Sequence, residues 1–93
     1  MILSVEYKQV VDKLEKIGSY ESSSSLIHGL MVLASDERME VVSPGVVNAY
    51  LRRKRLDQDL RTHAQEQAFA DLVVCLVATV NRARQRARLG EDY

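Results

Sequence analysis

The thirteen residues AFADLVVCLVATV, from Ala68 to Val80, hold a single charged side chain, Asp71. A membrane-spanning helix needs about eighteen or more apolar residues, so this segment is too short to cross a bilayer. Its β-branched content is compatible with a strand. However, polar helix formers flank it on both sides (THAQEQ and NRARQRAR) without turn residues, and an isolated strand needs sheet partners. We therefore predict a buried helix.

Helical spacing extends from this segment in both directions. Apolar side chains continue a four-residue step from Leu56 to Val80, and neither glycine nor proline occurs from Val46 to Leu89. Upstream, Ser43 suits an N-cap and Pro44 the first helical position, where its missing N–H costs nothing. The pattern predicts one helix over 44–89, either continuous or broken near 52–59 into two nearly collinear pieces.

Two shorter amphipathic helices are predicted before it. The stretch VEYKQVVDKLEKIG predicts a helix over 5–17, with Gly18 as a left-handed C-cap. The stretch SSLIHGLMVLASDERM predicts a second helix over 24–38, begun by a serine cap. Gly29 lies inside it at a cost of about 1 kcal/mol relative to alanine, which we attribute to close approach of a neighbouring helix. The predicted fold is all-α, with residues 1–93 as a single helical domain.

Helix length suggests a second copy of the chain. A continuous helix over 44–89 would span roughly 60 Å, more than two short helices can cover. A chain of this size buries only roughly 60–65% of its unfolded surface, and small cores are often completed by a partner. We therefore expect a helical-hairpin or bundle homodimer. The residues predicted to contact the second copy or another protein are Tyr50, Leu60, Phe69, Leu72, Val73, Leu76, Val77 and Val80.

The sequence offers no arrangement typical of an active site. His28 and His63 have no Cys, Asp or His partners at metal-binding spacings. Cys75, the only cysteine, lies in the most apolar part of the chain, where a structural thiol is expected rather than a nucleophile. We expect no enzymatic activity, cofactor or metal. One cysteine allows no internal disulfide and the N-terminus shows no secretory signal, so we expect a cytoplasmic protein without membrane contact.

Two clusters of basic residues bracket the apolar segment. Arg52, Arg53 and Arg55 precede it, and Arg82, Arg84, Arg86 and Arg88 follow it. Arginines on a helix can neutralise phosphates, so nucleic-acid binding is an alternative. Against it, arginine is favoured in any last helical turn, and arginines at every second position surround a helix rather than line one side. A helix-turn-helix over the second and third helices would also have a connection longer than the usual three to four residues.

The segment HAQEQAFADLVVCLV contains His63, Ala64, Gln65, Ala68, Leu72 and Leu76. It resembles the C-terminal helix of TraM-type anti-activators, which are small all-helical bacterial proteins. The first half of the chain and the basic stretch after Asn81 depart from that pattern. The resemblance implies a homodimer that binds a LuxR-type quorum-sensing transcription factor and blocks its DNA binding. The alternatives are a small DNA-binding transcriptional regulator that uses the arginine clusters, and a secretion-type chaperone or assembly subunit.

Overall fold

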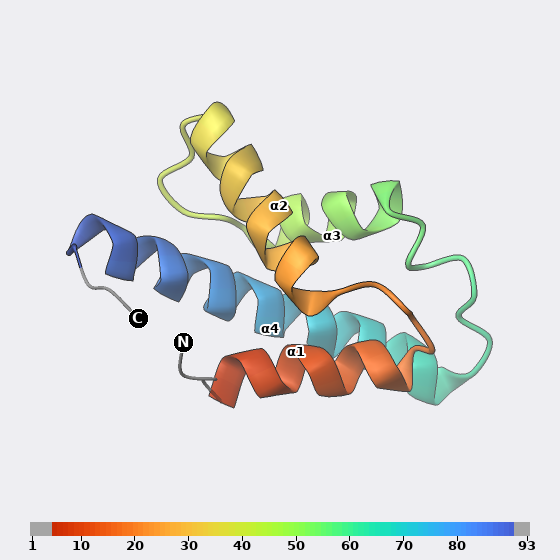
Figure 1. The fold of residues 1–93 in the computed structure, drawn as a ribbon. Helices are drawn as coiled ribbons and strands as arrows, with labels where there is room; N and C mark the ends of the chain where they lie inside the picture. Colours follow the sequence, from red (N-terminus) through yellow and green to blue (C-terminus); the bar gives the residue numbers. More distant parts are fainter. Residues whose placement is uncertain (1–4, 91–93) are drawn as a thin grey trace.

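The computed structural model describes residues 5–90, and within that range it contains helices and no strand. The four helices are α1 (Val5–Lys16), α2 (Ser23–Asp36), α3 (Pro44–Arg53) and α4 (His63–Arg88). Helix α4 contacts all three others, with α1 along one side and α2 and α3 on another (Figure 1). The predicted all-α class is therefore confirmed. None of these helices combines the length and apolar character that crossing a bilayer requires.

The expected long helix over 44–89 is divided, and its two parts are not collinear. Helix α3 ends at Arg53, the chain reverses over residues 54–62, and α4 returns alongside α3 (Figure 1). The 26 residues of α4 span about 39 Å, not 60 Å. Because the other three helices of the chain pack against α4, its length no longer argues for a second copy.

The break arises from two caps that need neither glycine nor proline. At the end of α3, the Leu56 N–H donates to the Leu51 carbonyl over 3.1 Å, and Arg55 adopts a left-handed φ of 63°. This is a Schellman ending with arginine at the position where glycine is usual. At the start of α4, the Gln65 N–H donates to Thr62 Oγ1 over 3.1 Å, and the Thr62 N–H donates to Gln65 Oε1 over 3.1 Å. This capping box marks where the helix resumes.

The serine-rich stretch before α2 begins that helix and ties it to α1. Ser22 is the N-cap, and its hydroxyl accepts from the Ser25 N–H over 3.3 Å. The Ser23 hydroxyl donates to the Tyr7 hydroxyl over 3.0 Å, and Ser24 Oγ lies 2.9 Å from the same oxygen. These bonds, chiefly the one from Ser23, lower the pKa of Tyr7 below its usual value.

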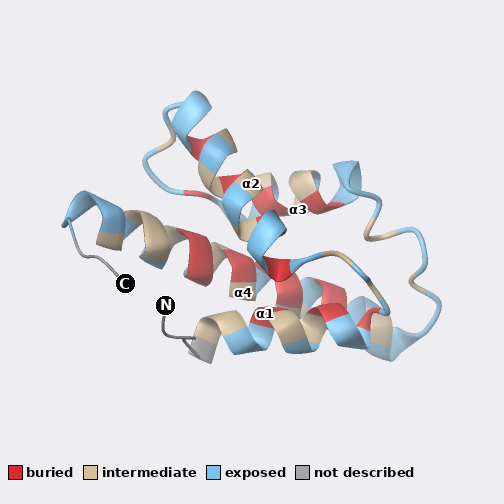
Figure 2. Cartoon of the chain, viewed as in Figure 1, coloured by how far each residue is buried: buried red, intermediate tan, exposed pale blue. Residues whose placement is uncertain are grey.

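The core lies where α1, α2 and α3 meet α4, on the inner faces of the helices (Figure 2). Each helix supplies the side chains that its amphipathic spacing predicts. The largest fully buried side chains are Val10, Leu26, Leu30, Val42, Val47, Leu51, Leu72, Leu76 and Val80. The apolar segment at 68–80 therefore lies mainly inside the fold of one chain.

Gly29 lies where Tyr50 of α3 crosses α2, which confirms the expected close approach. A Cβ at position 29 would lie 1.9 Å from the Tyr50 hydroxyl oxygen and 2.9 Å from Cζ of the same ring. No such contact is tolerated without movement of the ring. The glycine inside α2 is therefore explained by the packing of α3.

We predict that the effect of Gly29→Ala depends on Tyr50. In a helix interior alanine is favoured over glycine by about 1 kcal/mol, but in the wild-type protein the new methyl group displaces the phenol. We expect Gly29→Ala to be neutral or destabilising alone, and stabilising by about 1 kcal/mol in a Tyr50→Leu background. Urea unfolding of the four proteins measures this coupling. An equal gain in both backgrounds would show that the ring does not constrain position 29.

Candidate functional site

The residues predicted for an interface lie mostly within the single chain. Those that are buried are Phe69, Leu72, Val73, Leu76 and Val80, and those that are partly buried against the core are Tyr50, Leu60 and Val77. The chain's own helices cover the buried five, so their apolar character needs no partner. A contact surface must instead use side chains on the outer sides of the helices, together with the small exposed edges of Phe69 and Val73.

The arginines at the end of α4 are engaged inside the chain. Arg84 donates through Nη1 to the Glu40 carbonyl over 3.3 Å and through Nη2 to the Met39 carbonyl. Arg88 Nη2 donates to the same Glu40 carbonyl over 2.9 Å. Arg82 Nε lies 3.2 Å from a carboxylate oxygen of Glu6. Arg84 and Arg88 thus hold the connection between α2 and α3, and Arg86 is half-buried on the same helix.

Asn81 completes this attachment, and the sequence analysis did not single it out. Its Oδ1 accepts from the Val42 N–H over 2.9 Å, and its Nδ2 donates to the Val42 carbonyl over 2.9 Å. One side chain therefore satisfies both backbone groups of a residue that is 0% exposed. The next residue, Ser43, caps α3 by accepting from the Val46 N–H over 3.3 Å. Asn81 and the two arginines thereby set where α3 begins relative to α4.

That placement leaves an open groove of about 450 Å³ between α3 and the first half of α4, here called the α3–α4 groove. The residues that line it are Pro44, Gly45, Asn48 and Arg52 of α3, and Phe69, Ala70 and Val73 of α4. Gly45 keeps one wall low, because a Cβ there would meet only Ser43 Oγ, at 3.9 Å. The lining is mainly apolar, which suits an apolar side chain of a ligand or partner.

One end of the α3–α4 groove is basic. The Arg52 guanidinium lies 5.9 Å from the centroid of the Phe69 ring, and its Nη1 lies 3.1 Å from a carboxylate oxygen of Asp57. Arg53, Lys54 and Arg55 follow and are exposed. Of these four cations Arg52 lines the groove, whereas Arg55 lines another hollow together with Asp59 and Ile17. The first predicted basic cluster therefore borders an apolar groove, and the end of the groove favours a carboxylate.

A second surface, here called the α4 face, runs along the outer side of α4. Its exposed residues are Gln67, Ala70, Val74, Ala78, Arg82 and Gln85, of which Arg82 carries a charge. Val74 keeps 66% of its surface exposed. The face extends over about five helical turns of a chain in which 28% of residues are charged. A single large apolar side chain among small and polar ones is ordinary for an exposed helix side, so this face by itself assigns no contact.

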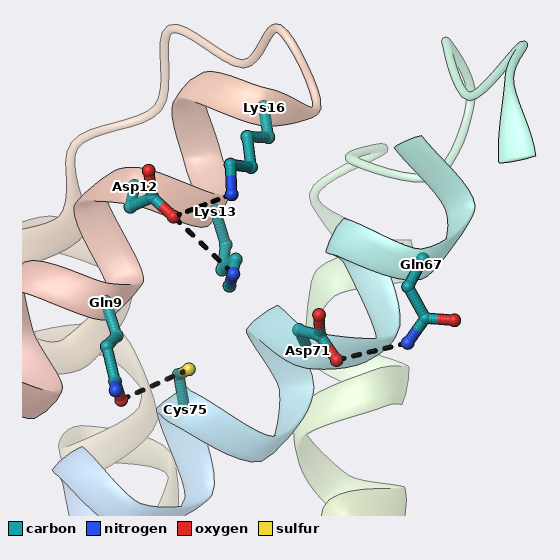
Figure 3. A network of polar contacts seen from close by, with 7 residues as sticks. All are labelled: Gln9, Asp12, Lys13, Lys16, Gln67, Asp71 and Cys75. Atoms are coloured by element: carbon teal, nitrogen blue, oxygen red, sulfur yellow. Dashed lines mark hydrogen bonds and ion pairs between the residues drawn. The ribbon is translucent and has the colours of Figure 1, made fainter. Parts of the chain in front are cut away.

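Cys75 lies beside α1 and is half-buried rather than buried as expected. Its thiol points to Gln9, with Sγ 3.8 Å from Oε1 (Figure 3). Burial raises the pKa of this thiol, Asp71 and Asp12 raise it further, and Lys13 opposes them. The polar contact of the sulfur within residues 5–90 is with the Gln9 amide, which is not a base, and a raised pKa disfavours the thiolate that a nucleophilic cysteine needs. Among residues 5–90, no group of three or more His, Cys, Asp or Glu side chains is placed to hold a metal ion.

We predict that Cys75 reacts slowly with disulfide reagents at pH 8. A raised pKa means that less thiolate is present than for an ordinary cysteine, whose pKa is about 8.5. The rate should rise with pH to a midpoint above that value, and should increase on unfolding in urea. Stopped-flow measurement with Ellman's reagent gives the midpoint of the pH dependence and the reaction rate in urea. A midpoint below the ordinary value would contradict the assigned environment.

We also predict that Asn81→Ala destabilises the fold. Loss of the amide leaves two groups of the Val42 backbone without partners, which costs about 2–3 kcal/mol. Gln85→Ala, one turn along the exposed side of α4, is the matched control and should change the free energy of unfolding by less than about 0.5 kcal/mol. Urea unfolding compares the two variants. Equal stabilities would mean that the α2–α3 connection is held by other contacts.

No known relative supplies a role for the groove or for the α4 face. Comparison of this chain with protein-family models, with curated proteins and with solved structures gives no match. The chemistry of the groove itself therefore carries the functional inference.

Proposed function

We propose that this chain is a small binding protein without catalytic activity, and that the α3–α4 groove is its contact site for another protein. The observation that carries the proposal is an apolar groove with a basic end. Phe69 and Val73 contribute to its lining, and Arg52 and Arg53 lie toward the basic end. A partner segment with one apolar side chain followed by a carboxylate matches that order of chemistry.

The proposed role is regulation by occupation of the partner's surface. The resemblance of residues 63–77 to TraM-type anti-activators supports a LuxR-type transcription factor as the partner. Such a mechanism is steric: the bound chain covers a surface that the factor needs for DNA, and no bond is made or broken. A partner whose acidic residues meet the basic end of the groove would associate faster at low salt than at high salt.

The engagement of Arg84 and Arg88 bears on the nucleic-acid alternative. Both guanidinium groups bind backbone carbonyls of the α2–α3 connection, so a phosphate would have to compete with these contacts. The exposed cations at the end of α3 then remain as the main basic surface. That surface borders the groove, which favours an acidic protein segment over a phosphate backbone.

We predict that Gly45→Glu abolishes partner binding without loss of stability. Position 45 has room for a side chain, and glutamate in the first turn of a helix is favoured over glycine. The new side chain obstructs the groove and places a negative charge where a carboxylate is expected to bind. Ser25→Glu, in the first turn of α2 and away from the groove, is the matched control.

Immobilised wild-type, Gly45→Glu and Ser25→Glu proteins are compared by capture from host extract with quantitative mass spectrometry. A partner is a host protein that the wild-type and Ser25→Glu baits retain and the Gly45→Glu bait does not. The purified partner is then titrated with this chain to measure their binding. If the partner is a LuxR-type factor, its release from DNA on addition of this chain is measured. Equal capture by all three baits would contradict the groove assignment. Tight, salt-sensitive DNA binding by the chain alone would favour the nucleic-acid alternative.

A further inference from the structure

We propose that the α3–α4 groove binds the free C-terminal end of a partner chain in extended form, with the terminal carboxylate on Arg52. This inference rests on the function proposed above and names the part of the partner that occupies the groove. Three observations carry it: the order of chemistry along α3, the position of Arg52 beside Phe69, and the connection that joins the two helices at the basic end.

The side of α3 that lines the groove presents an apolar group, an amide and a cation in that order. Pro44, Asn48 and Arg52 are spaced four residues apart, so they follow one another along one side of the helix. At 1.5 Å per residue they extend over about 12 Å, which an extended chain covers with three or four residues. An apolar side chain, a peptide group and a carboxylate on such a chain can therefore meet the three residues in turn.

The α4 wall of the groove indicates which partner residues are apolar. Phe69 and Val73 are about 6 Å apart along the helix axis. Side chains two residues apart in an extended chain point to the same side and are separated by about 7 Å. Because the Arg52 guanidinium lies 5.9 Å from the centroid of the Phe69 ring, the last partner residue would lie against Phe69. The residue two positions before it would then lie against Val73.

Arg52 has the capacity to bind a further carboxylate. Its Nη1 donates to Asp57 over 3.1 Å, and the side chains are 57% and 26% exposed. A guanidinium has five N–H donors, so one bond to Asp57 leaves donors for a second carboxylate on another edge. An exposed ion pair of this kind contributes about 0.2–1 kcal/mol. The pair therefore opposes a second carboxylate only weakly.

The basic end of the groove favours a chain end over an acidic side chain within a chain. Helix α3 ends at Arg53, and residues 54–62 then join it to the start of α4 (Figure 1). A partner chain that continued beyond Arg52 would have to pass this connection and the Asp57 carboxylate. A chain that ends at Arg52 avoids both. At the other end Gly45 keeps the wall low, so the rest of the partner can leave there.

Nuclear magnetic resonance titration of the ¹⁵N-labelled full chain with short peptides tests the inference. The probe is acetyl-leucyl-seryl-leucine with a free carboxylate, and the matched control is the same peptide with a C-terminal amide. We expect the free acid to shift the backbone signals of Asn48, Phe69 and Val73 and to bind about tenfold more tightly than the amide, because only the acid gives charge-assisted hydrogen bonds. Equal affinities, or a free acid that does not bind at its highest soluble concentration, would overturn the inference.

Two variants test the role assigned to Arg52. Arg52→Gln should weaken binding of the free acid by about tenfold and leave binding of the amide unchanged. Arg53→Gln is the matched control, because Arg53 is the next cation of α3, is exposed and does not line the groove. Circular dichroism melting of both variants should match that of the wild-type protein. An equal loss of affinity in the two variants would show a general attraction to positive charge and would contradict the assigned site.

A third peptide separates failure of this inference from failure of the proposed function. Acetyl-leucyl-seryl-aspartyl-glycine amide has its only carboxylate on an internal side chain. If it shifted the same signals and bound more tightly than the free acid, the groove would remain a protein contact site but the chain end would be wrong. Weaker binding than the free acid would support the chain end. Equal capture of host proteins by the wild-type and Gly45→Glu baits would instead contradict the proposed function, whichever peptide binds.

Discussion

Burial of the inner side of α4 is the constraint on which the rest of the structure depends. Helix α4 packs against all three other helices and makes the most extensive contact, with α1, and Leu72 and Leu76 on its inner side are 0% exposed. Burying a leucine contributes about 1.5–3 kcal/mol, comparable with a substantial part of a small domain's stability. Three short helices that are marginal alone are stabilised by packing on this one surface.

The polar residues at the end of α4 determine which surface stays open between α3 and α4. Asn81 and Arg84 bind the backbone of residues 39–42, and this places the start of α3 beside the first half of α4. The groove exists because α3 is held there and because Gly45 adds no side chain. Arg84, which we predicted as part of a basic contact surface, thus holds the connection between α2 and α3. The exposed cations at the end of α3 lie where the apolar groove ends.

The apolar segment is buried along one side of α4 and exposed along another. Its buried residues form the core of one chain, while Ala70, Val74 and Ala78 face outward from the same helix. Phe69 and Val73 lie between these sides and contribute to the groove. One helix thereby contributes both to the core and to the lining of the groove, because each uses another part of its circumference.

Local pattern by itself predicted the helical class of this protein, the positions of α1 and α2, and the start of α3. Amphipathic spacing predicted α1 and α2, and Ser43 and Pro44 predicted where α3 begins, because these signals act within one or two turns. Leu72, which we expected at an interface with a partner, lies instead in the core of the single chain. The Thr62 and Gln65 capping box was also readable, but a cap contributes only about 1 kcal/mol and does not say where the chain goes next. Only the tertiary structure decided the use of Asn81 and Arg84 and which side of α4 stays exposed. Those features depend on contacts between residues about forty positions apart, and no local pattern records which helices will cover which side.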